Sequence, residues 1–293
     1  CRSITQTMAN AASGDTIQVR PGIYGGNTNF DAVVGGPGEE VPTFGGMLTI
    51  VKPLIILSTD GAAATLIEGL GVITNYSVLI LAGDVEFGRP GHGFMVTPPQ
   101  NSTSAGIGVF ATNVKVRGNL LVNGQTATGI LTANAQADIL IEKNEVVGWD
   151  TGIAARGLDN VVSKNQVSRS VFGIYAAGGD VVGNVVVGCT TGIKVDAFAT
   201  AIGNAVNGNR TGILTGGPAP AVIQKNNIFG NSVCGLTQAA TLGVVVDATD
   251  NYWGAATGPG SDPADSVCSA GSGTATTTPF ATLRYSINPT FDP

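Results

Sequence analysis

The sequence predicts an all-β protein, a single-stranded right-handed parallel β-helix with three short strands in each coil. Three observations support this: a composition low in charge and rich in glycine, two motifs that recur in phase, and alternating apolar residues within each repeat. Of the 293 residues, 43% are hydrophobic but only 12% are charged, about half the usual share of about 25%. Such a chain is typical of short strands joined by tight turns, because disordered segments have few apolar residues and much charge.

Two motifs recur through the second half of the chain. The first, a Gly-Ile or Gly-Leu pair, recurs at intervals of 19 to 23 residues and begins at Gly129, Gly152, Gly173, Gly192, Gly212 and Gly235. The second is an asparagine followed two residues later by an apolar side chain, found at Asn144, Asn165, Asn184, Asn204, Asn226 and Asn251, with Asn119 opening the series. The leucine-rich repeat has a similar period but needs a Leu-x-x-Leu-x-Leu frame, which is missing here, so one β-helix coil per repeat is favoured.

The repeat at 137–155 shows how one coil is expected to form. ADILIEK is a strand, Asn144 the bend, EVVGW a second strand, Asp150-Thr151 a turn and GIAA a third strand. Coils stack about 4.8 Å apart, so alternate Val and Ile side chains should form apolar columns inside the cylinder. Asparagine tolerates unusual backbone angles at a bend, and its amide can bond to the asparagine of the next coil. The six recurrent asparagines are therefore predicted to form a ladder.

The chain is expected to be one continuous domain of roughly 10–12 coils. At its start, Ile4, Met8 and Ala11 fall at helical spacing, and a short helix there would cap the unpaired end of the stack. Glu39 and Glu40 are expected to be solvated loop charges. Four regions are predicted: a cap helix at 1–16, early coils with long excursions at 17–105, regular repeats at 106–254, and a tail at 255–293 that folds back over the last coil.

The four cysteines, Cys1, Cys189, Cys234 and Cys268, allow three pairings. Cys189 and Cys234 should lie two coils apart, about 9–10 Å, which exceeds the limit of about 7 Å for a disulfide. We favour a Cys234–Cys268 bridge, which would indicate an oxidising, exported setting; the alternative is that these are small buried thiols. Cys1 fits either the acylated end of a mature lipoprotein or a chain that begins inside a longer protein.

Charge and hydropathy exclude two kinds of partner. The net charge is −6 and there is no basic run, which argues against nucleic acid bound through its phosphates. No apolar run reaches about 18 residues, so no membrane-spanning helix is expected.

Four segments resemble a known family: GDTIQVRPGIYGG, LTIVKPLIIL, the repeated GI…KN-x-V unit, and the closing NYWGAATGPG. They are similar to bacterial right-handed parallel β-helix repeat proteins of the pectin-lyase-like superfamily, including its NosD-like and surface-exported members. The resemblance covers nearly the whole chain. It implies an exported bacterial protein, extracellular or at the cell surface, with a polysaccharide or cell-surface glycan as partner. Because this fold hosts lyases, hydrolases, epimerases, tailspikes and adhesins, activity must be argued from the site.

The hydrolase and epimerase activities of the superfamily have little support. The sequence has one histidine, His92, no Asp-Asp or Glu-Asp pair, and no Tyr-Gly-x-Asp-Pro-His run of the epimerase type. A lyase needs less, since the resemblance implies a Lys or Arg base and Ca²⁺ held by carboxylates, on the strand after each Gly-Ile pair.

The outward positions of those strands, two and four residues after the glycine, carry Arg156, Tyr175, Lys194 and Asp196 on three consecutive coils, within about 10 Å. In a lyase, Lys194, Arg156 and Tyr175 would be catalytic, and Asp196 would bind substrate. Asp196 with Asp180 would be the candidate Ca²⁺ ligands. The alternative is a solvated sheet face that carries the few charges needed for solubility.

Trp253 in the NYWG element has two interpretations, a core plug near the end of the stack or a platform on which a sugar ring stacks.

Two functions follow from these residues. The favoured one is an extracellular non-catalytic module with a surface or structural role, which binds a glycan or self-associates into a fibre and needs no cofactor. It rests on sparse charge, one histidine and no carboxylate pair. The alternative is a polysaccharide lyase that acts by β-elimination on a uronic-acid polymer, with Ca²⁺ as its metal.

Overall fold

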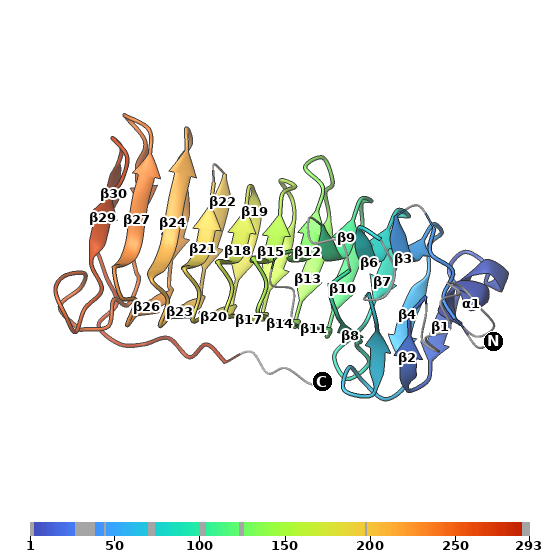
Figure 1. The fold of residues 1–293 in the computed structure, drawn as a ribbon. Helices are drawn as coiled ribbons and strands as arrows, with labels where there is room; N and C mark the ends of the chain where they lie inside the picture. The colour runs from blue at the N-terminus through green and yellow to red at the C-terminus, as the bar shows by residue number, and fades with distance from the viewer. Residues whose placement is uncertain are drawn as a thin grey trace.

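The protein is a right-handed parallel β-helix, as predicted. The computed structural model describes residues 3–26, 39–43, 45–69, 74–99, 104–122, 126–196 and 198–288. In Figure 1 the chain winds into a stack of coils with one short helix, α1 (Ile4–Asn10), at the first end. Across these ranges the strands form three parallel sheets of eleven, nine and ten strands, here called sheets A, B and C.

Successive strands of one coil belong to different sheets, so strand neighbours in a sheet lie three elements apart in the chain, or two at the last pair of sheet A and the last pair of sheet C. Sheet A contains β1 (Thr16–Val19), β4 (Ile55–Ser58), β7 (Val85–Phe87), β10 (Val114–Arg117), β13 (Ile139–Glu142), β16 (Val161–Ser163), β19 (Gly179–Val182), β22 (Ala199–Ile202), β25 (Val222–Gln224), β28 (Val245–Asp247) and β30 (Thr274–Thr276). Sheet B contains β2 (Gly22–Tyr24), β5 (Thr65–Ile67), β8 (Met95–Val96), β11 (Leu120–Val122), β14 (Glu145–Val147), β17 (Gln166–Ser168), β20 (Val185–Val187), β23 (Ala205–Asn207) and β26 (Asn227–Phe229). Sheet C contains β3 (Gly46–Ile50), β6 (Tyr76–Ile80), β9 (Ala105–Val109), β12 (Thr128–Thr132), β15 (Thr151–Ala155), β18 (Phe172–Ala176), β21 (Thr191–Val195), β24 (Thr211–Gly217), β27 (Cys234–Ala240) and β29 (Val267–Ser269).

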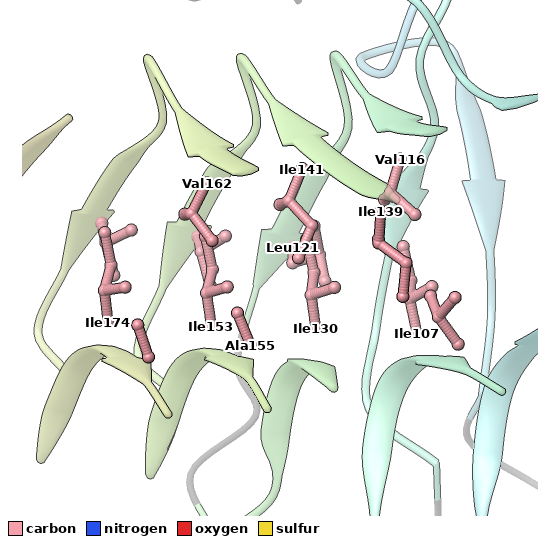
Figure 2. Close-up of a cluster of buried hydrophobic side chains, with 14 of the residues drawn as sticks. Ile107, Val116, Leu121, Ile130, Ile139, Ile141, Ile153, Ala155, Val162 and Ile174 are labelled. Atoms are coloured by element: carbon pink, nitrogen blue, oxygen red, sulfur yellow. The ribbon is translucent and has the colours of Figure 1, made fainter. Parts of the chain in front are cut away.

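The core consists of apolar columns that run along the stack. Parallel pairing places Ile153 opposite Ile130 on one side and Ile174 on the other, with Ile193 next in the column. Figure 2 shows this row of isoleucines facing a second row from sheet A, which includes Ile141. All of these side chains are fully buried. Because each contributes about 2 kcal/mol or more through burial, the columns supply the main attraction between coils.

A ladder of asparagines lies in the turns between sheets A and B. The backbone N–H and the Nδ2 of Asn165 donate to Oδ1 of Asn184, at 2.8 and 3.0 Å, and Nδ2 also donates to the Ile141 carbonyl at 2.9 Å. The same contacts repeat from coil to coil, and the ladder comprises Asn119, Asn144, Asn165, Asn184, Asn204, Asn226 and Asn251. The left-handed backbone angle that was expected at the asparagine lies one residue earlier, at Lys164 (φ 55°) and its equivalents. The asparagine therefore serves as a hydrogen-bonding group rather than as the bend.

A second ladder, which the sequence did not predict, lies in the turns between sheets B and C. The backbone N–H of Cys189 donates to Oδ1 of Asn209 at 2.9 Å, and the backbone N–H of Asn209 donates to Oδ1 of Asn231 at 3.0 Å. Asn231 then donates from Nδ2 to the carboxylate of Asp265 at 2.6 Å. A carboxylate thus terminates this ladder near the end of the stack.

The first end of the stack is closed by α1. Ile4 and Met8 are buried against the first coils, and Ser3 caps the helix by accepting from the Gln6 N–H. Glu39 and Glu40 are both buried, so the prediction of solvated loop charges was wrong for both. Glu40 accepts from the backbone N–H groups of Ile4 and Thr5 at 2.6 and 2.7 Å. A carboxylate is favoured there because the first N–H groups of a helix have no internal partner.

Beyond the last regular coil, the chain is held by a disulfide and by its tail. Cys234 and Cys268 are bonded, with their Cα atoms 6.1 Å apart. The tail turns back beside the lower edge of the stack in Figure 1, where the Asn227 Nδ2 donates to the Tyr285 carbonyl at 2.9 Å. The Arg284 guanidinium lies 3.9 Å from the ring centroid of Phe229. Within the described ranges, the one helix has seven residues, and no helix is long and apolar enough to cross a bilayer.

Replacing Asn184 by alanine tests the first ladder. The change removes a carbonyl that accepts two bonds from Asn165 and an amide that donates to Asn204 and to the Val162 carbonyl. Since each buried polar group left without a partner costs about 1–3 kcal/mol, we expect the free energy of unfolding to fall by about 3 kcal/mol. Urea unfolding followed by circular dichroism measures it. Asn207→Ala, on the outer face of β23, is the control and should change it by less than about 0.5 kcal/mol.

Replacing Asp265 by asparagine tests the second ladder through its pH dependence. Burial raises the pKa of Asp265 above its ordinary value of about 3.9, although hydrogen bonds from Asn231 oppose this. A raised folded-state pKa means that the folded protein binds the proton more tightly, so this stabilising contribution is lost as the pH rises through the folded pKa. We expect Asp265→Asn to gain stability relative to the wild type as the pH rises from about 4 towards neutrality. A difference that stays constant over this range would contradict it.

Candidate functional site

The outer face of sheet C carries the four side chains that the sequence singled out. Register places Tyr175 between Ala154 and Lys194 on neighbouring strands β15, β18 and β21. Asp196 follows β21. Its N–H donates to the carbonyl of Ala176 at 2.9 Å, so Asp196 lies beside the end of β18, the strand that contains Tyr175. Tyr175 and Lys194 are half-buried, whereas Ile174 and Ile193 beside them in the strands are buried, so the two polar side chains lie on the outer face.

Three of these side chains form one contact cluster. The Tyr175 hydroxyl donates to Oδ2 of Asp196 at 2.7 Å. The Lys194 ammonium lies 3.7 Å from Oδ1 of the same carboxylate and 4.6 Å from the centre of the Tyr175 ring. The side chains of Lys194 and Asp196 are 31% and 28% exposed, so the cluster is reachable from solvent. Its members satisfy one another and still leave room for an external partner.

Arg156 lies on the neighbouring coil at the edge of the cluster. Its backbone N–H donates to the Thr132 hydroxyl at 2.9 Å, and its side chain is exposed. Within the described ranges its guanidinium forms no ion pair, so it offers a planar set of donors to a ligand.

The electrostatic surroundings hold the Tyr175 phenol in its protonated form. Burial raises its pKa, and the hydrogen bond to Asp196 together with the charge of that carboxylate raises it further, while the Arg156 guanidinium lowers it. A phenol with a raised pKa is a poor general base near neutral pH, because little of it is ionised.

The structure separates the two candidate metal ligands. Asp180 lies in β19 of sheet A, where it accepts from the Thr200 hydroxyl at 2.7 Å, whereas Asp196 follows β21 of sheet C. In the parts of the chain that the structure describes, no group of three or more His, Cys, Asp or Glu side chains converges as a metal site would require.

Trp253 corrects one expectation. Its side chain is 0% exposed and belongs to the core, so it cannot present a ring face to a sugar. The residue is a plug at the end of the apolar columns, which is the other interpretation that its sequence allowed. His92, the one histidine, is held by its Nδ1 at 3.0 Å from the Ser58 carbonyl.

A chain of alternating charges on sheet A was not predicted. Arg117 contacts Glu86 at 3.2 Å and Glu142 at 2.8 Å, and the ends of the chain are extended by Arg89 and Lys164. The hydrogen bond from Arg89 lowers the pKa of Glu86. All five charges are paired, so this row stabilises neighbouring coils and leaves no free cation for a ligand. Its signal in the sequence was the register of Arg117 with Glu142.

Comparison with known proteins assigns the family. The family model described as periplasmic copper-binding protein (NosD) matches residues 98–259, more than half of the chain. The chain belongs to the NosD family. No curated protein matches the chain.

Solved structures similar to this member of the NosD family share its fold. The A-module of the mannuronan C-5 epimerase AlgE4 of Azotobacter vinelandii has 17% sequence identity and a TM-score of 0.50, over 84% of this chain and 72% of that one. The pectate lyase Pel9A has 14% identity and a TM-score of 0.44, over 96% and 73%. The alginate lyase of Paenibacillus sp. str. FPU-7 has 15% identity and a TM-score of 0.40, over 97% and 95%. At 17% identity, the likeness to the AlgE4 A-module shows the fold alone.

The family description raises the question of copper, and the side chains do not fit it. Copper sites in proteins use imidazole, thiolate and thioether ligands held together. His92 is the only histidine, and its Nδ1 contacts a carbonyl. Burial raises the pKa of the Cys189 thiol to about 11, so it is a protonated core residue rather than a thiolate ligand. Among the residues that the structure describes, no three His, Cys, Asp or Glu side chains converge where copper could bind.

Titration of Tyr175 tests the geometry of the cluster. Since Asp196 raises the pKa of the phenol, Asp196→Asn should lower it towards its ordinary value of about 10, and Arg156→Gln should raise it. The measurement is the pH dependence of the tyrosine ζ-carbon resonance, assigned with Tyr175→Phe. Unchanged titration in Asp196→Asn would show that the hydrogen bond is not formed in solution.

Proposed function

We propose that the protein is a non-catalytic β-helix module that binds a polysaccharide on the outer face of sheet C. The observation that carries the proposal is the mutual pairing of Tyr175, Lys194 and Asp196, which leaves a polar, partly exposed face without a free base. The edge of an aromatic ring beside a cation and a carboxylate suits a ligand rich in hydroxyl groups, because each hydroxyl can both donate and accept.

The pairing also argues against β-elimination as the main activity. Elimination on a uronate needs a group that removes a proton and a positive charge or metal that neutralises the carboxylate. Here the Tyr175 proton is held by Asp196, and the Lys194 ammonium is engaged by the same carboxylate. Of the four side chains singled out on this face, Arg156 is the one without an ion partner among the described residues, and a guanidinium is in general a weak base.

We place this function outside the cytoplasm, in the extracellular space or at the cell surface. The Cys234–Cys268 disulfide supports an oxidising compartment, since such bonds are rare where thiols are kept reduced. The description of the NosD family as periplasmic is consistent with export. The buried turns, joined by asparagine ladders, favour a fold that resists unfolding, which suits a protein outside the cytoplasm.

Binding and turnover are tested together on the same polymers. Purified protein is incubated with polygalacturonate, alginate and glycosaminoglycans, with and without Ca²⁺, and both binding by affinity electrophoresis and the ultraviolet absorbance of unsaturated products are recorded. We expect binding to at least one polymer without product. Lys194→Ala and Tyr175→Ala should each weaken binding about tenfold, since a charged hydrogen bond contributes about 1.5–3 kcal/mol.

The matched control is Lys115→Ala, an exposed lysine on the outer face of sheet A, which should leave binding unchanged. Product that accumulates in the wild type and disappears in Lys194→Ala would replace this proposal with the lyase alternative.

A further inference from the structure

A second polar groove lies in the turns between sheets B and C, away from the Tyr175 cluster. It has a volume of about 600 Å³, and its lining includes Arg169, Ser170, Gly188, Thr190 and Arg210. The Arg169 N–H donates to the Val187 carbonyl and the Arg210 N–H to the Cys189 carbonyl, so the two arginines stand on the first and third of three successive coils. At a coil spacing of about 4.8 Å, they lie about 10 Å apart along the stack.

Arg169 occupies a position that other coils fill with glycine. Register aligns the residues after β14, β17, β20, β23 and β26, which are Gly148, Arg169, Gly188, Gly208 and Gly230. All five have a left-handed backbone, with φ of 77°, 57°, 68°, 63° and 67°. A residue with a Cβ is disfavoured there relative to glycine. The arginine therefore costs stability relative to the glycine found at this position in the neighbouring coils.

The groove is electropositive on a protein of opposite charge. Arg169 and Arg210 are both exposed, and across the described ranges neither guanidinium forms an ion pair or a side-chain hydrogen bond. No carboxylate lines the groove; Asp150 is the acidic residue in the register column of Val171 and Thr190, on the preceding coil. A Cβ at Gly188 would meet no atom within 4 Å, so the space between the arginines is open. With a net charge of −6, two unpaired arginines in one groove are not needed for solubility.

From this geometry we propose that the groove binds the carboxylates of an acidic polysaccharide that lies along the stack. Each guanidinium presents parallel N–H donors that match a carboxylate, and the two sites suit carboxylates spaced along an extended chain. The exposed hydroxyl of Thr190 between them suits a sugar hydroxyl. A nucleic acid is disfavoured because its dense charge would meet an acidic protein with two cations at the contact.

The inference deepens the proposed function by naming the ligand class, and rests on it, but it uses different residues. The probe is an oligogalacturonate of fixed length, compared with the same oligomer after methyl esterification, which removes the charges and keeps the sugar chain. Affinities are measured by isothermal titration calorimetry at low ionic strength. We expect the wild type to bind the acid at least tenfold more tightly than the ester.

Two variants locate the site. Arg169→Gly restores the glycine of the neighbouring coils, so its thermal midpoint should equal or exceed that of the wild type while its affinity for the acid falls about tenfold. Arg210→Gln should lower the affinity by a similar factor. Neither variant should change binding of the ester.

The control removes as many positive charges as the two arginine variants together, but from another corner of the coil. Lys143→Gln with Lys225→Gln removes two positive charges in the turns between sheets A and B and should leave the affinity for the acid unchanged. Equal affinity for acid and ester, or equal loss in the lysine control, would overturn the proposal. If Lys194→Ala binds the acid as the wild type does while Arg169→Gly does not, the groove stands and the sheet C proposal fails.

Discussion

The in-register stacking of coils is the constraint on which the rest of the molecule depends. A coil of about twenty residues contacts little beyond its two neighbours, so every buried polar group in its turns must find its partner there. The asparagine ladder provides these partners at one corner. Within the ladder, the Oδ1 of Asn184 accepts two bonds from the coil before, and its Nδ2 donates to a carbonyl of the coil before and to the asparagine of the coil after. The apolar columns supply attraction, but they would allow coils to slide or rotate. The ladder fixes the register that keeps each isoleucine above its counterpart.

The same constraint explains the ends. At the ends of the stack, two carboxylates accept N–H groups that have no partner in a further coil, and a disulfide joins the last two strands of sheet C. Glu40 accepts the free N–H groups of α1, Asp265 receives the last amide of the second ladder, and the Cys234–Cys268 disulfide ties β27 to β29. These contacts join residues 34 to 36 positions apart, outside the repeat period. They are the parts of the fold with no periodic signal, which is why Glu40 was mistaken for a solvated charge.

What could be predicted from the sequence follows from this difference. The first ladder and the isoleucine columns use one residue type at one spacing, so their repetition was visible. At the equivalent positions of the second ladder, the residues are Cys189, Asn209, Asn231 and Asp265. No residue type recurs often enough among them to reveal the ladder in the sequence. Strand alternation was enough to place Tyr175 and Lys194 on one outer face. It could not show that Asp196 turns back to hold the Tyr175 proton, because that contact depends on side-chain conformation beyond the end of β21.

In each coil of a β-helix, the positions that stabilise the fold differ from those that are available for function. Inward positions and ladder positions are occupied for packing and hydrogen bonding, so a side chain there reports on the fold, as Trp253 does despite its aromatic ring. Outward and turn positions are less constrained by packing and hydrogen bonding. The aligned residues of the neighbouring coils show which residue type the backbone prefers at each of them. A glycine column interrupted once, at Arg169, is therefore more informative than an exposed charge taken alone. The strain is local, the neighbouring coils avoid it, and the one gain available at that position is a guanidinium directed to solvent beside an open groove.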